Sequence, residues 1–100
     1  MYGDTHGYKT ARLTATGNVA AGGAIKRLIA LRAKGGAAAG VCEIYDDAAA
    51  TAAQKLGGIN CAIGTWNAMG PCPQAVSKLH VTLDANITEA IVVYEPGGAP

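Results

Sequence analysis

The stretch from Lys78 to Glu95 constrains the fold more than any other part of the chain. Apolar and polar residues alternate from Lys78 to Leu83, which is the period-two pattern of a strand with one buried face. Ile91 to Tyr94 form a β-branched and aromatic run that favours a second strand. Asp84 to Asn86 supply a turn between them, because Asp and Asn bond their own backbone and tolerate left-handed conformations. The stretch therefore predicts a β-hairpin that closes the domain.

Other segments also have strand character, with Gly-rich or Asp-rich turns between them. The predicted strands are residues 8–16, 24–34, 40–46, 59–63 and a short one within 64–70. For residues 24–34 a helix competes, because apolar residues also recur there at helical spacing. We choose a strand, since Gly pairs bound both ends and no N-cap residue precedes Ala24. The Ala-rich segment near 47–56 has the highest helical propensity and predicts one short helix.

Six to eight short strands separated by frequent turns predict an all-β fold, an antiparallel β-sandwich. One hundred residues are enough for one domain. We expect a flexible N-terminal arm at 1–7, a single sandwich domain at 8–95 and a flexible tail at 96–100. The polar N-terminus predicts no signal peptide, and no apolar run is long enough for a transmembrane helix.

The hydrophobic fraction of 50% overstates the core that this chain can build. Alanine supplies 21 residues, whereas isoleucine, leucine and valine together supply 19, and phenylalanine is absent. An Ala methyl contributes much less on burial than a Leu or Ile side chain, and 14 glycines increase the entropy lost on folding. We therefore expect a marginal monomer that gains stability by burying surface between identical subunits.

Reactive side chains are few, and they match no catalytic signature. Ser77 is the only serine, and no Gly-rich segment has a phosphate-binding spacing. The three cysteines and two histidines, Cys42, Cys61, Cys72, His6 and His80, have separations that fit no paired zinc-ligand motif. We expect reduced thiols, with a Cys61–Cys72 bridge left open, and neither an enzyme nor a cofactor or metal site.

The basic cluster Lys26, Arg27, Arg32 and Lys34 gives a second candidate surface, as electrostatic support for the N-terminal arm. As a strand, it places Lys26, Arg32 and Lys34 on one face, where they could meet an acidic protein surface or nucleic acid. With net charge +1 and few aromatic residues nearby, nucleic acid is the poorer of these two partners. A solvated face is the other reading of such a cluster.

The order of elements resembles that of small bacteriophage proteins that decorate or cement the capsid. The resemblance spans about residues 14–95. Its features, in order, are Gly22-Gly23 opening a long strand through Ala33, the strand end Ile44-Tyr45-Asp46, Pro71, Leu79 to Leu83, and Ile91 to Glu95. The resemblance implies a small β-sandwich of jelly-roll type that sits as a homotrimer on the outside of a phage head. It carries no functional residue over to this chain.

On this reading the protein is made in the host cytoplasm and resides in the virion, at the capsid surface. Its partners would be itself and the major capsid protein, with no membrane and no direct nucleic-acid contact. We predict partner contacts through the arm and the cationic face, namely Tyr2, Asp4, His6, Tyr8, Lys26, Arg32 and Lys34. Two alternatives stay open: another virion component, such as a head-fibre base, neck or tail protein, and a non-viral β-sandwich binding module.

Overall fold

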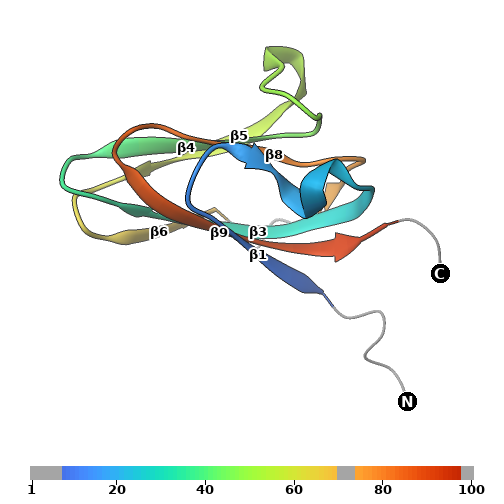
Figure 1. The fold of residues 1–100 in the computed structure, drawn as a ribbon, viewed down its shortest axis with the longest axis horizontal. Helices are drawn as coiled ribbons and strands as arrows, with labels where there is room; N and C mark the ends of the chain where they lie inside the picture. Colours follow the sequence, from blue (N-terminus) through green and yellow to red (C-terminus); the bar gives the residue numbers. More distant parts are fainter. Residues whose placement is uncertain (1–7, 70–73, 98–100) are drawn as a thin grey trace.

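The chain forms two antiparallel β-sheets packed face to face (Figure 1). The computed structural model describes residues 8–69 and 74–97. Sheet I contains β1 (Lys9–Leu13), β9 (Ile87–Pro96), β3 (Ile25–Gly35) and β6 (Trp66–Met69) in that order, and β7 (Gln74–Ala75) also pairs with β3. Sheet II contains β2 (Gly17–Asn18), β8 (His80–Leu83), β4 (Gly40–Tyr45) and β5 (Lys55–Cys61).

The strand pairs are nested along the chain. Strand β1 pairs with β9, β2 with β8, β3 with β6 and β4 with β5, and every pair is antiparallel. A long hairpin that is rolled up in this way gives the connectivity of a jelly roll. The predicted all-β antiparallel sandwich is therefore confirmed. The described residues form nine strands where six to eight were expected, because β2 and β7 contribute only two residues each.

The core lies between the sheets and is small. Its largest fully buried side chains are Leu28, Leu31, Ile44, Leu79, Val19, Val81, Val92, Cys42 and Cys61. Among the described residues no polar or charged residue is buried, and Tyr94 is the one aromatic residue in the core cluster. Two thiols thus occupy positions that a larger aliphatic side chain could fill, as expected for a chain poor in such residues.

Strand β3 contains two irregularities that explain its ambiguous sequence pattern. Its register against β9 shifts between Ile25 and Arg27 and again between Leu28 and Ala30. Each shift inserts one extra residue, so Ile25, Leu28 and Leu31 all face the core although they are three residues apart. A bulged strand therefore imitates the spacing of a helix. The choice of a strand for 24–34 is confirmed.

The hairpin predicted for the C-terminal stretch is wrong in its pairing. Strands β8 and β9 form where they were expected, but β8 lies in sheet II and β9 in sheet I. The turn between them has the predicted chemistry, since Asp84 Oδ1 accepts a hydrogen bond from the Asn86 N–H at 2.8 Å. The two strands thus bury their apolar faces in the shared core from opposite sheets and do not lie side by side; one apolar face per strand fits either arrangement.

The short helix expected near 47–56 is a single 3-10 turn, Ala52–Gln54. Residues 48–50 supply no side chain larger than a methyl group, and Lys55 already begins β5, which pairs with β4 through both Gly57 and Gly58. The strand therefore starts four residues before the predicted segment 59–63 and ends at Cys61. The segment between β4 and β5, green in Figure 1, projects beyond sheet II.

The last described residues, up to Gly97, are hydrogen-bonded to sheet I. Strand β9 continues to Pro96, and the Gly97 N–H donates a hydrogen bond to the Ala24 carbonyl at 3.1 Å. Two residues of the segment predicted as a tail, 96–100, thus belong to the sheet or contact it. The predicted arm at 1–7 lies outside the described residues. In the part of the chain that is described, no helix has the length and hydropathy needed to span a membrane.

Candidate interaction surface

The side of sheet I that faces away from the core carries most of the cations of the chain. We call this side the outer face; its residues are Arg12, Lys26, Arg27, Ala30, Arg32, Lys34, Trp66, Ala68, Glu89, Ile91, Val93 and Glu95. Five of the eight Lys and Arg residues lie here with two carboxylates, an excess of three positive charges. Since the whole chain has a net charge of +1, its remaining residues are net acidic.

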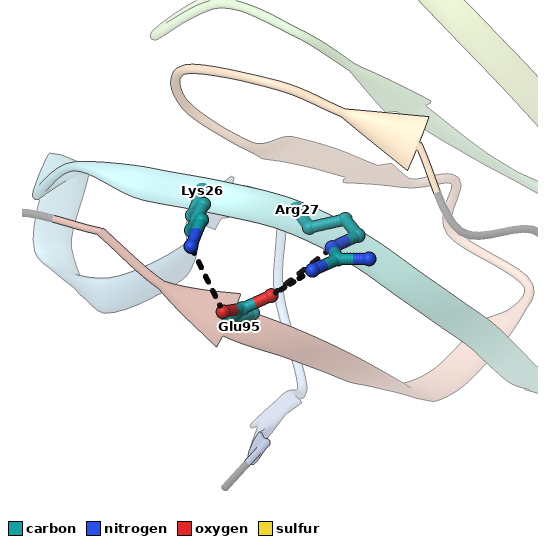
Figure 2. Close-up of polar contacts among 3 residues, drawn as sticks. All are labelled: Lys26, Arg27 and Glu95. Carbon is teal, nitrogen blue, oxygen red and sulfur yellow. Dashed lines mark hydrogen bonds and ion pairs between the residues drawn. The ribbon is translucent and has the colours of Figure 1, made fainter. Parts of the chain in front are cut away.

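One carboxylate of the outer face, Glu95 on β9, is shared between two cations of β3 (Figure 2). Its Oε1 lies 2.8 Å from an Arg27 guanidinium nitrogen, and its Oε2 lies 3.5 Å from Lys26 Nζ. Burial acts to raise the pKa of Glu95, but the Arg27 hydrogen bond and the two positive charges outweigh it, so this pKa lies below its ordinary value. The ion pair with Glu95 thus engages Lys26, which lies at the first bulge of β3.

The other carboxylate of the outer face, Glu89 on β9, forms an ion pair with Arg12 on the adjacent strand β1. The Arg12 Nε donates a hydrogen bond of 2.5 Å to Glu89 Oε2, and the side chain of Glu89 is only 16% exposed. This hydrogen bond is the main reason why the pKa of Glu89 is lowered; burial opposes it. Both acids of the outer face are thus held in their charged form by cations of β1 and β3.

Arg32 and Lys34 differ from these residues, because neither forms an ion pair with any described residue. The Arg32 guanidinium carbon lies 5.5 Å from the ring centroid of Trp66, a cation–π arrangement. Lys34 is the register partner of Trp66 on β6. Trp66 is 43% exposed, and Ile91 and Val93 are half-buried on the adjacent strand. Lys34 also lies opposite Glu89 in the register of β3 and β9. Two cations outside the ion pairs that the described residues of this face form, one aromatic ring and an aliphatic strip thus share one surface.

The opposite side of the sandwich is polar and locally paired. On sheet II, Glu43 accepts hydrogen bonds from Lys55 Nζ and from the Tyr45 hydroxyl. The Lys55 hydrogen bond is the largest cause that lowers the pKa of Glu43. His80 Nδ1 lies 2.6 Å from the side-chain oxygen of Asn18, and its ring is 6.4 Å from that of Tyr45. Each of these five polar side chains thus has a partner on its own sheet, and the two charged ones, Glu43 and Lys55, pair with each other.

An open cavity of about 320 Å³ lies beside the projecting segment, lined by Asp46, Asp47, Gln54, Ser77 and Lys78. Its carboxylates have structural partners. Asp46 Oδ1 accepts the backbone N–H groups of Ser77 and Lys78 at 2.9 and 3.2 Å, and Asp47 Oδ1 accepts the Ala48 N–H. The hydrogen bonds of Asp46 therefore hold the segment after β4 against the segment before β8.

The two described thiols are free and lie in the core. Burial is the main cause that raises the pKa of Cys42 to about 12, and the pKa of Cys61 is also raised by burial. Cys61 Sγ lies 3.5 Å from the Ala33 carbonyl oxygen. Cys72 lies outside the described residues. In residues 8–69 and 74–97 no three His, Cys, Asp or Glu side chains come together as a metal site would require.

The structure brings together Lys26, Arg32 and Lys34, the three cations that the sequence placed on one face. Tyr8, 58% exposed, immediately precedes β1, while Tyr2, Asp4 and His6 lie outside the described residues. The role of all seven in partner contact stays a prediction. Sequence reasoning missed Arg12, Trp66, Glu89 and Glu95, because their place on this face depends on the pairing of distant strands. The one signal in the sequence for this surface was that Trp66 is the only tryptophan of the chain.

The fold and this surface define a jelly-roll β-sandwich domain with a cationic, partly apolar sheet face. Comparison of the chain with protein-family models, with curated proteins and with solved structures found no match in any of the three.

Proposed function

We propose that this chain is a structural virion protein that binds the outside of an assembled bacteriophage head as a homotrimer. Bound there, it would stabilise the capsid by linking coat subunits. The observation that carries the proposal is the outer face of sheet I, where an excess of cations and half-buried aliphatic side chains share one sheet surface. The partners are other copies of the chain and the major capsid protein. We propose no catalytic role.

The fold supports this proposal in a general way. Jelly rolls recur in viral capsid proteins, and also in lectins and cupins, so the topology alone assigns no function. A rigid sheet face positions binding side chains more precisely than loops do. Arg32, Lys34 and Trp66 stand on paired strands, which is the arrangement that a permanently attached structural protein would use.

The small core supports the homotrimer. The core of the described residues relies on Cys42 and Cys61 and on buried residues no larger than Leu apart from Tyr94, so little burial stabilises the isolated chain. Apolar side chains that are not part of the outer face, such as Val41 and Ile63, are exposed and still have surface to cover. Association of copies around a closed symmetry axis would bury such surface, as in other symmetric homo-oligomers.

The first test is the molar mass of the purified chain by light scattering after size exclusion. We expect about three times the 10.0 kDa of one chain. A well-folded monomer across micromolar concentrations would remove the argument from the core and favour the alternative of a monomeric binding module.

The second test is attachment to heads. Purified heads of the phage that encodes the chain, prepared without it, are mixed with the protein and separated by sedimentation. We expect saturable binding with a copy number that is a multiple of three. Binding at one copy or one small ring per particle would instead assign the chain to the neck, the tail or a head fibre. Absence of binding would reject the proposal.

A further inference from the structure

We infer that the outer face of sheet I is an attachment surface that recognises an acidic protein surface, with Arg32, Lys34 and Trp66 as its anchor. The inference rests on the proposed function, in that the acidic surface would belong to the coat protein. It adds the binding face, the charge of the partner and the residues that carry most of the binding free energy.

Positive charge is unevenly distributed over the outer face. Glu89 and Glu95 are each engaged by cations of their own face, namely Arg12 for Glu89 and the pair Lys26 and Arg27 for Glu95. Arg32 forms no ion pair with a described residue, and Lys34 lies opposite Glu89 in register, but the hydrogen bond of Glu89 goes to Arg12. This end of the face thus has three cations, Arg12, Arg32 and Lys34, around one carboxylate, and a carboxylate from another molecule would complete an ion pair with Arg32.

The end of the outer face around Arg32 has the residue types of a protein interface. Trp and Arg are the residue types that most often dominate binding energy in protein interfaces. Here the Arg32 guanidinium is already held 5.5 Å from the Trp66 ring centroid, so part of its side-chain freedom is lost before a partner arrives. Beside them, Ile91 pairs with Arg32 in register and offers an aliphatic surface that a protein, more than a polyanion, can cover.

Two other occupants fit this face less well. A second copy placed face to face about a twofold axis would bring together two surfaces that each have an excess of three positive charges, which is unfavourable. Nucleic acid would bring phosphates close to Glu89 and Glu95 and would find a single aromatic ring for stacking. An acidic protein surface with an apolar patch satisfies both the cations and the aliphatic strip.

The experiment measures binding to the same purified heads at increasing salt concentrations. The double variant R32E/K34E reverses two charges of the anchor and is expected to bind at least tenfold more weakly than wild type at low salt. The matched control K55E/K78E makes the same change in net charge away from this face and is expected to bind within about twofold of wild type. The variant R32K/K34R keeps both charges but removes the guanidinium that lies over Trp66, so it is expected to bind more weakly than wild type and more tightly than R32E/K34E.

The variant Trp66→Ala tests the contribution of the aromatic ring separately from that of charge. It removes the ring without changing net charge, so we expect weaker binding with an unchanged salt dependence. Thermal unfolding of each variant verifies that it is folded, which is expected because all the altered side chains lie at the surface.

The outcomes separate the two proposals. If wild type binds heads and R32E/K34E binds equally well, this face is not the attachment surface, although the proposed function stands. If the control K55E/K78E loses as much binding as R32E/K34E, the effect reflects overall charge and the inference is overturned. If wild type binds a 20-base-pair DNA duplex more tightly than heads, and R32E/K34E removes that binding, the face recognises nucleic acid. If wild type binds no heads, both proposals fail.

Discussion

At Gly35 the last residue of β3 passes against the chain that leads from sheet II into β6. Its N–H donates a hydrogen bond to the Thr65 carbonyl at 3.0 Å, and a Cβ built on it would fall on the carbonyl oxygen of Ala62. Gly40 is similarly confined, since a Cβ there would lie 2.6 Å from the Asp84 carboxylate that binds the Val41 N–H. These two glycines allow the close approach of segments at this end of the sandwich.

Gly35→Ala is expected to lower the free energy of unfolding by about 2 kcal/mol or more, because the obstructing atom belongs to the backbone and cannot rotate away. Urea denaturation followed by circular dichroism measures the change. Gly17→Ala is the control. A Cβ at Gly17 would meet its nearest neighbours at 3.9 Å, an ordinary contact, so the loss should stay below about 0.5 kcal/mol. Equal losses would contradict the close approach at Gly35.

The buried thiols permit a chemical prediction. Because burial raises the pKa of both Cys42 and Cys61, neither carries appreciable thiolate at pH 8 in the folded protein. In a Cys72→Ser background we expect no rapid reaction with a thiol-specific disulfide reagent. Two equivalents should react after the addition of denaturant. Rapid native-state labelling of either residue would show that the core opens more readily than its packing indicates.

At the scale of elements, β3 decides which residues face the core and which face a partner. Simple alternation would place Ile29, Leu31 and Ala33 on one side. The register shift between Leu28 and Ala30 instead leaves Ile29 half-buried, whereas Leu31 and Ala33 are completely buried. The shift thus decides which residues of β3 lie on each face, with Leu31 and Ala33 in the core and Arg32 and Lys34 on the outer face.

Leu31→Ala is therefore expected to destabilise the protein by about 2–5 kcal/mol, because it leaves a cavity in a small core. Ile29→Ala, the matched control on the other side of the shift, should cost less than about 1.5 kcal/mol. Urea unfolding of both variants, carried out near the temperature of maximum stability, gives the comparison. A cost for Ile29→Ala as large as that for Leu31→Ala would mean that both side chains face the core.

Local sequence signals predicted most of the strands and the existence of the sandwich, because alternation in segments such as Gly40 to Tyr45 reports burial directly. They could not predict the partner of each strand. The turn at Asp84 has the same local chemistry whether the chain returns within one sheet or crosses to the other. The outer face was only partly predictable for the same reason, since Arg12 and Glu89 meet through pairing of residues far apart in sequence.

At the scale of the whole molecule, charge is divided between the two sides of the sandwich. Five of the eight cations lie on the outer face of sheet I, while Glu43, Asp46, Asp47 and Asp84 lie on sheet II or its connections. Such a division orients a protein as it approaches a charged surface. It raises the rate of productive encounter and makes that rate sensitive to salt.

Removal of residues Met1 to Gly7 tests the part of the proposal that concerns the arm. Strand β1 begins at Lys9 and pairs with β9 over its full length, so the truncated protein should keep its unfolding temperature within a few degrees. We expect weaker attachment to heads, measured by co-sedimentation, because the predicted contacts Tyr2, Asp4 and His6 are lost. Unchanged occupancy would reject a role for the arm.

The position of β9 has a consequence for how the molecule is made. This strand follows β1 and β3 in the chain but lies between them in sheet I, and among the described strands β1 pairs with β9 alone. During synthesis on the ribosome, the earlier strands must wait for residues 87–96 before their sheet can close. Folding is therefore expected to be slow and to occur in one late cooperative step. Until then the nascent chain would expose β1 and the apolar face of β3, which makes it a client for a holding chaperone.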